Sequence, residues 1–205
     1  MIVWALDLSY PTGVQAEGPD PDEHTCPPWQ VVTWEHAARG GSDALAVPCK
    51  VVWYHGPEGM KRRAATLQPM VGGETNINKW GIGVAFVGDK GVLTADYGKL
   101  VISPSADFKD FKRPEQTIPK SKGHYNEWLA ACKGQDKTDT LCNFDYSGKL
   151  IEHNLLGIPA HRVGGGKKLA WDAERFTFTN APEADQYLTK TYREGWKPAP
   201  ETKQS

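Results

Sequence analysis

The pattern of apolar residues changes near Pro119, and this change constrains the fold more than any other feature of the sequence. Before it, β-branched and aromatic residues cluster in short runs, such as 29–35 and 50–55, separated by glycine and proline. That composition is typical of strands. After it, apolar residues recur at helical spacing. Strands followed by helices without strict alternation predict an α+β fold: one open, mostly antiparallel sheet with helices on one face, and no Rossmann domain.

The clearest antiparallel pair is residues 83–87 and 92–95, joined by Gly88-Asp89-Lys90-Gly91. We expect the two glycines to supply the positive φ angles that a tight turn requires. Residues 56–80 are instead rich in glycine, proline and charge. They are expected to form a connection, with the basic cluster Lys61-Arg62-Arg63 in solvent.

The first helix expected after the change spans residues 122–133. Apolar residues fall at i, i+3, i+4 and i+7 from Tyr125, which is the spacing of one helix face. Ser121 is the expected N-cap, and Gly134 is expected to end the helix.

A second helix is expected to begin with Asp145 as its cap. Pro159 lacks an N–H and its ring collides with a preceding carbonyl, so we expect a kink or an early end near Leu156. A short strand at residues 168–172 and a third helix over about 182–194 follow.

Composition excludes several classes of protein. The 205 residues predict a single domain over 1–196 with a disordered tail at 197–205. A net charge of −1 gives no electrostatic footprint for nucleic acid. No apolar run approaches the roughly 20 residues that span a bilayer, so no membrane partner is expected. The opening Met1–Leu6 segment is too short and wrongly flanked for a signal peptide, which favours a cytoplasmic location.

The sequence shows no metal or nucleotide motif. The four cysteines and six histidines lack the paired spacing of zinc sites. Residues 81–86 lack the third glycine of a dinucleotide fingerprint, and Gly164-Gly165-Gly166-Lys167-Lys168 lacks the Ser or Thr of a phosphate-binding loop. Both segments are interpreted as turns, and no cofactor is expected to be bound by this chain alone.

Three residues are candidates for a substrate-binding role: Trp53, His124 and Asn143. Trp53 could present an aromatic face to a carbohydrate, although a strand tryptophan is more often in a core or interface. Asn143 precedes the second helix and could contact a ligand. No catalytic residue is predicted in the chain.

His124 admits two interpretations. In the first turn of a helix the dipole favours its neutral form, which could accept a proton. Alternatively it is a surface histidine satisfied by Glu127 three residues later. Ser147 lacks the surrounding motif of a hydrolase nucleophile, so a hydrolase that depends on His124 is the weaker hypothesis.

Seven segments, in order, resemble the C-terminal, bacterial-type domain of the Gfo/Idh/MocA-type NAD(P)-dependent oxidoreductases. They are Trp4-Ala5-Leu6-Asp7-Leu8 with Tyr10-Pro11-Thr12; Val52-Trp53-Tyr54 with Gly56; Phe86-Val87-Gly88-Asp89-Lys90-Gly91 with Ala95-Asp96-Tyr97-Gly98; Gly123-His124 with Glu127-Trp128 and Ala131-Cys132-Lys133; Asn143-Phe144-Asp145-Tyr146-Ser147-Gly148 with Leu155-Leu156-Gly157; Leu169-Ala170-Trp171-Asp172-Ala173-Glu174; and Pro182-Glu183-Ala184-Asp185 with Tyr192-Arg193-Glu194-Gly195-Trp196.

The resemblance implies an enzyme with two domains. An N-terminal Rossmann domain binds NAD(P), and the C-terminal domain forms part of the pocket for a sugar or polyol and the interface of a homo-oligomer. The family's cofactor fingerprint, catalytic lysine and catalytic histidine all precede the segment that Trp4 begins here.

We therefore expect a C-terminal substrate-pocket and oligomerisation domain that lacks the cofactor-binding half and is inactive alone in hydride transfer. A separate Rossmann-domain chain is a candidate partner. The open sheet face is expected to carry tryptophans and tyrosines and to form the oligomer contact. The alternative is a stand-alone carbohydrate-binding or homo-oligomeric interaction module.

Overall fold

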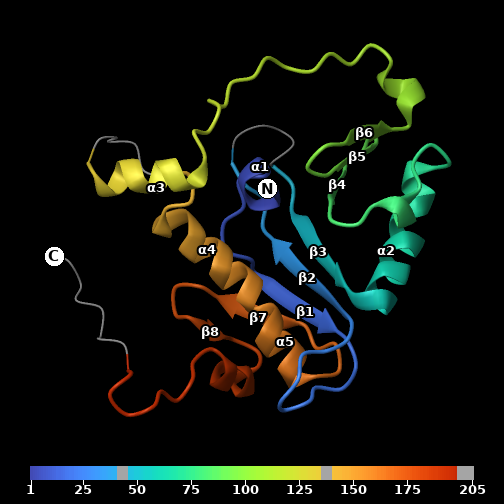
Figure 1. Ribbon diagram of the computed structural model, residues 1–205. Helices are drawn as coiled ribbons and strands as arrows, with labels where there is room; N and C mark the ends of the chain where they lie inside the picture. The colour runs from blue at the N-terminus through green and yellow to red at the C-terminus, as the bar shows by residue number, and fades with distance from the viewer. Residues whose placement is uncertain (41–45, 135–139, 198–205) are drawn as a thin grey trace.

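The computed structural model describes residues 1–40, 46–134 and 140–197, and its strands form two antiparallel sheets (Figure 1). The larger has the strand order β3-β2-β1-β7-β8, and the smaller has the order β4-β5-β6. The expected tail lies outside the described residues from position 198 onward. The strands are β1 (Gly13–Glu17), β2 (Gln30–His36), β3 (Cys49–His55), β4 (Val84–Val87), β5 (Val92–Ala95), β6 (Leu100–Ser103), β7 (Leu169–Asp172) and β8 (Thr177–Phe178).

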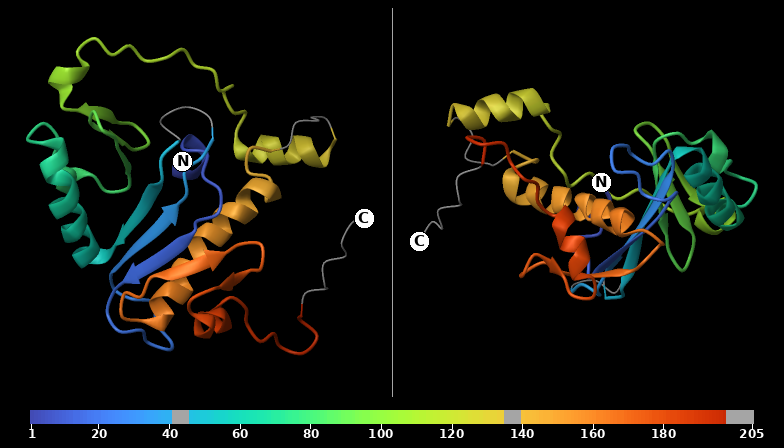
Figure 2. Two further views of the ribbon diagram at one scale, coloured as in Figure 1. Left: turned by 180° about the vertical axis from the view of Figure 1, so that it is seen from behind. Right: turned by 90° about the horizontal axis from the view of Figure 1, so that it is seen from below.

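Two consecutive helices, α4 and α5, cross one face of the large sheet, as Figure 2 shows. The expected α+β class and the open antiparallel sheet with helices on one face are confirmed. The separate small sheet was not predicted. The helices are α1 (Ile2–Ala5), α2 (Gly56–Val71), α3 (His124–Cys132), α4 (Phe144–Leu155) and α5 (Gly157–Val163), with short 3-10 segments η2 (Ile77–Lys79), η3 (Ser105–Phe108) and η4 (Pro182–Tyr187).

The main core forms where alternate strand residues face α4 and α5. Residues paired directly across antiparallel strands share a face, and Trp34 is paired with Val14 on β1 and with Val51 on β3. Burying a large apolar side chain contributes about 1.5–3 kcal/mol. The buried members of this cluster are Val14, Ala16, Val32, Trp34, Leu156, Ala160, Leu169, Trp171, Phe178, Ala181 and Ala184.

A second apolar cluster attaches the small sheet to α2. Val71 of α2, Ile77 of η2 and Val92 of β5 are buried together. The side chain of Gln68 reinforces the corner, because its amide donates to the carbonyl of Thr75 and accepts from the N–H of Ile77. The two sheets therefore belong to separate cores that are connected through α2.

The open face of the large sheet carries charged residues together with Val31, Val52 and Tyr54. The expectation that it carries tryptophans is wrong for the strand tryptophans. Trp53 is paired with the core residue Val32 and therefore shares the helix-bearing face with Trp34 and Trp171. Tyr54, one residue on, points to the other face, because strand side chains alternate.

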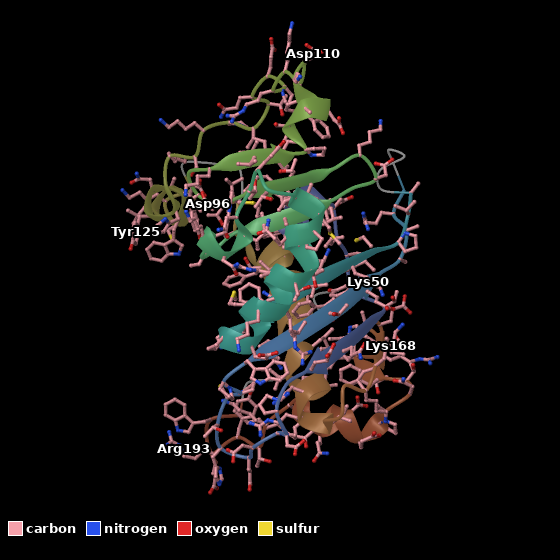
Figure 3. The ribbon with its side chains drawn as sticks, turned by 90° about the vertical axis from the view of Figure 1, so that its right-hand side faces the viewer. Lys50, Asp96, Asp110, Tyr125, Lys168 and Arg193 are labelled. Atoms are coloured by element: carbon pink, nitrogen blue, oxygen red, sulfur yellow. The ribbon has the colours of Figure 1, made fainter. Side chains whose placement is uncertain are left out.

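An ion-pair row crosses this open face. The Glu35 carboxylate on β2 contacts the Lys50 ammonium at 3.6 Å and the Lys168 ammonium at 2.5 Å, and both lysines lower the pKa of Glu35, Lys168 most. Lys168 reaches Glu35 across β1, where Gly13 has no side chain; a Cβ there would lie 3.6 Å from Lys168 Cε. Figure 3 shows Lys50 and Lys168 on the side of the molecule opposite Asp96 and Tyr125.

Residues 56–71 form a helix of 16 residues, so the expectation of a connection there is wrong. Pro57 lies in the first turn, where its missing N–H costs nothing, and Glu58 in the same turn complements the helix dipole. The following run of methionine, lysine, arginine, alanine and leucine has high helix propensity. The glycines and prolines at its ends masked this signal.

The basic cluster lies on α2 and makes tertiary contacts. Arg62 donates to the Glu17 carboxylate at 2.8 Å and stacks on Trp29, with its guanidinium carbon 4.6 Å from the ring centre. Arg63 donates to the carbonyl of Ile77 at 3.0 Å. The prediction of a solvated loop is therefore wrong for both arginines.

The predicted β4–β5 hairpin is confirmed, but its glycines act differently from the expectation. Neither Gly88 nor Gly91 has a positive φ. Gly91 is required for space, because a Cβ there would lie 2.4 Å from the carbonyl oxygen of Ser103.

The helix predicted at 122–133 is confirmed as α3, which ends before Gly134 at φ +61°. Its N-cap is Gly123 rather than Ser121. The Ser121 hydroxyl instead accepts from the N–H of Gly123 and bonds the Glu127 carboxylate.

The predicted break near Leu156 is confirmed, since α4 ends at Leu155 and α5 begins at Gly157. Pro159 is the third residue of α5, where no intrahelical N–H is required. The expected cap Asp145 lies inside the first turn of α4, and the N-cap is Asn143.

The helix predicted over 182–194 is wrong. The segment forms only the 3-10 helix η4, which ends at Tyr187. The Asp185 carboxylate accepts from the backbone N–H of Phe178 at 2.8 Å and bonds the Thr177 hydroxyl. This attachment to β8 holds the segment in the 3-10 conformation, which is tighter than an α-helix.

Candidate functional site

A cavity of about 680 Å³ lies between the two sheets, on the helix-bearing side of the large one. Cavities of this size commonly hold small ligands. Its walls come from α1, β2, β3, α4, α5 and the β4–β5 hairpin. The lining residues are Met1, Ile2, Val3, Gln30, Val32, Trp34, Val51, Trp53, Ile82, Gly83, Val84, Ala95, Asp96, Tyr97, Leu150, His153, Asn154, Gly157 and Ile158.

Large apolar side chains line this cavity without being buried in either core. Trp53 is 59% exposed, Ile82 is 78% exposed and Tyr97 is 93% exposed. Trp53 extends from the floor formed by the large sheet, whereas Ile82 and Tyr97 belong to the wall next to the small sheet. Exposed apolar groups that converge on a cavity are characteristic of ligand sites.

Few polar side chains line the cavity: Gln30, Asp96, Tyr97, His153 and Asn154. Asp96 terminates β5, and its carboxylate accepts from the backbone N–H groups of Gly98 and Lys99 at 2.8 and 2.7 Å. These two hydrogen bonds lower the pKa of Asp96, so the carboxylate is ionised at neutral pH. The remaining polar groups are uncharged amides, a phenol and an imidazole.

The imidazole belongs to a buried histidine pair. His36 Nε2 and His153 Nε2 are 3.1 Å apart, and each residue is 3% exposed. The His153 ring also stacks on Trp34, with the ring centres 4.7 Å apart. Burial lowers the pKa of His153. Burial, the neighbouring His153 and Arg39 together lower the pKa of His36 to about 4. Both rings are therefore neutral at pH 7.

Of the three predicted substrate-binding residues, Trp53 lines the cavity. His124 is exposed on α3, with its ring 4.1 Å from the ring of Tyr125. Asn143 caps α4 by accepting from the N–H of Tyr146 at 2.9 Å. The structure therefore does not bring the three residues together, and Asn143 has a structural role as a helix cap.

His153 and Asn154 were not predicted as site residues, although the sequence contains a signal for them. Leu150, His153, Asn154 and Gly157 follow one another at i, i+3, i+4 and i+7, and all four line the cavity. That spacing marks one face of a helix. A polar pair within such a stripe indicates a face that is directed to a ligand or a buried polar network.

The glycine-rich segments do not fit a nicotinamide dinucleotide. Gly83 leads into β4, in a sheet whose strands are all antiparallel, and not into the strand-to-helix turn that holds a pyrophosphate. Residues 164–166 line a second cavity, of about 350 Å³, that also contains the carboxylates of Glu17 and Asp20. Carboxylates disfavour phosphate, and Arg62 beside them is already paired with Glu17.

Within residues 1–40, 46–134 and 140–197, no group of three or more His, Cys, Asp or Glu side chains is placed to hold a metal ion. Over the same ranges, no helix is both long and apolar enough to cross a membrane. This chain matches none of the protein-family models and none of the curated proteins with which it was compared. The family resemblance therefore rests on the sequence segments alone.

Proposed function

We propose that this chain is the C-terminal, substrate-pocket and oligomerisation domain of a Gfo/Idh/MocA-like oxidoreductase that acts on sugars or polyols. The observation that carries the proposal is the cavity between the sheets, which combines an exposed aromatic floor at Trp53 with uncharged amides at Gln30 and Asn154. Aromatic faces pack against the C–H surfaces of sugars, and amides both donate to and accept from hydroxyl groups.

In this proposal NAD(P) is held by a Rossmann domain outside these residues, on a separate chain or another segment. The glycine segments, which do not fit a dinucleotide, support this division. The domain binds no cofactor alone and performs no hydride transfer alone. The four free cysteines suit a reducing compartment, where nicotinamide cofactors also occur, and we place the protein in the cytoplasm.

The proposal is tested by calorimetric titration with myo-inositol, D-glucose and D-xylose, and separately with NADH. At least one neutral polyol is expected to bind saturably, at millimolar or lower concentration, and NADH is expected not to bind. Trp53→Ala is expected to weaken polyol binding at least fivefold, because it removes the aromatic floor. Saturable NADH binding, or no polyol binding by the wild type, contradicts the proposal.

A stand-alone carbohydrate-binding module is the second candidate, because this chain walls the cavity from several of its own elements. The two candidates differ when a Rossmann-domain chain is supplied. Dehydrogenase activity that appears only in the mixture favours the enzyme domain. Polyol binding that no such chain converts into turnover favours the module.

The open face of the large sheet is the proposed homo-oligomer contact. Thr33 lies near its centre, paired with Gln15 and Val52. Thr33→Arg is expected to shift the sedimentation coefficient from an oligomer to a monomer, because two added cations meet across a symmetric interface. Thr117→Arg, on an exposed connection, is the matched control and should leave the oligomer intact. A monomeric wild type, or a Thr33→Arg variant that stays assembled, contradicts this contact.

A further inference from the structure

The donor and the acceptor in the hydrogen bond between the two buried histidines follow from the other partners of the pair. The Asn154 side-chain oxygen lies 3.1 Å from His153 Nδ1, and an amide oxygen only accepts hydrogen bonds. His153 Nδ1 therefore carries the proton. Since a neutral imidazole has one N–H, His153 Nε2 then carries a lone pair and accepts from His36 Nε2–H across the 3.1 Å contact. This tautomer leaves the buried His36 Nδ1 unprotonated and without a hydrogen-bond partner among the described residues.

This arrangement fixes the orientation of the Asn154 amide. Its oxygen is held by His153, and its nitrogen makes no hydrogen bond to another described residue. Asn154 lies on the cavity wall, so its N–H groups are available to an occupant. His153 itself has no free ring nitrogen to offer, because His36 and Asn154 occupy both.

The charges around the cavity restrict what it can hold. Among the described residues, no lysine or arginine side chain contributes to the lining, and the ionised side chain there is Asp96. Removing a phosphate or carboxylate from water without a cationic side chain beside it is costly. A neutral molecule rich in hydroxyl groups meets amide donors and acceptors without that cost.

We propose that Asn154 determines specificity in this cavity by donating to a hydroxyl of an uncharged polyol, and that His36 and His153 are positioning residues that hold its amide in the donating orientation. This inference rests on the proposed function and adds the exclusion of sugar acids and sugar phosphates.

Nitrogen-detected NMR of the imidazole rings tests the positioning part without a ligand. His153 is expected to be protonated at Nδ1 and His36 at Nε2. Asn154→Asp should preserve both tautomers, because a carboxylate accepts from Nδ1–H as the amide oxygen does. The opposite tautomers in the wild type overturn the inference whatever the protein binds.

Calorimetry tests the specificity part with myo-inositol and D-glucose, and with myo-inositol 1-phosphate and D-glucuronate as their anionic counterparts. The neutral compounds are expected to bind at least tenfold more tightly than the anionic ones. Asn154→Asp should weaken the neutral compounds about 3- to 10-fold, which corresponds to one lost hydrogen bond.

His36 supplies a matched pair of variants. His36→Phe removes the donor to His153 and is expected to weaken polyol binding although residue 36 does not line the cavity. His36→Gln restores an N–H at that position and should recover most of the affinity.

The outcomes distinguish a failure of the proposed function from a failure of the specificity role of Asn154. If the wild type binds no neutral polyol, the proposed function fails and the specificity role fails with it. If the wild type binds and Asn154→Asp binds equally well, or if the anionic compounds bind as tightly as the neutral ones, only this inference is overturned.

Discussion

The protein is expected to lose about 2 kcal/mol of its free energy of unfolding between pH 7 and pH 5, and about 3 kcal/mol by pH 4, through His36 alone. Burial, the neighbouring His153 and Arg39 hold the pKa of His36 at about 4 in the fold, against about 6.5 in the unfolded chain. Between these values the unfolded state binds more protons, so stability falls as pH falls.

Urea unfolding followed by circular dichroism at pH 7 and pH 5 measures this loss. His153, whose pKa burial also lowers, adds to the effect in the same direction. His36→Gln keeps a donor to His153 but does not titrate, and it should remove most of the pH dependence attributed to His36. His24→Gln, at an exposed position, serves as the control and should leave it unchanged. Equal pH slopes for His36→Gln and the wild type would contradict the assignment.

The second large effect is expected at Trp34. Trp34→Ala should lower the free energy of unfolding by about 3–5 kcal/mol, because it opens a cavity in the main core. Trp34 is 5% exposed and packs on the His153 ring. A methyl group at Gly157 would lie 3.6 Å from its ring, which shows how closely α5 approaches it.

Trp53→Ala is the matched comparison, since Trp53 lies on the adjacent strand and the same face. Trp53 is 59% exposed, so its removal should cost less than about 1 kcal/mol. The two substitutions therefore differ in their effect on stability: Trp34→Ala is expected to lower it strongly, whereas Trp53→Ala is expected to affect mainly binding. Equal losses of stability in the two variants would show that the cavity wall is part of the core.

The α+β class and the helical break near Leu156 were predictable because each follows from a local rule. The change of period near Pro119 separates strands from helices, and the ring of Pro159 prevents one continuous helix. The helix α2 was not predicted, since its glycine and proline residues cluster at the ends, where they are tolerated. The length of η4 depends on the contact between Asp185 and β8, which only the folded chain brings about.

Of the three substrate-binding residues predicted from the sequence, one, Trp53, lines the candidate site. Trp53 stands next to Tyr54 in a strand, and alternation places one of them on each face without indicating which. The register of β3 against β2 settles this, because Trp53 pairs with the core residue Val32. The pairing of His153 with His36 could not be predicted, because His36 lies 117 positions away in the sequence.

A crystal structure of the chain soaked with the neutral polyol that binds most tightly in the titrations would show whether the cavity between the sheets is the ligand site. We expect the polyol in the cavity between the two sheets, with a C–H face against Trp53 and a hydroxyl group within hydrogen-bond distance of Asn154 Nδ2. A polyol bound outside this cavity, for example on the open face near Glu35, would contradict it.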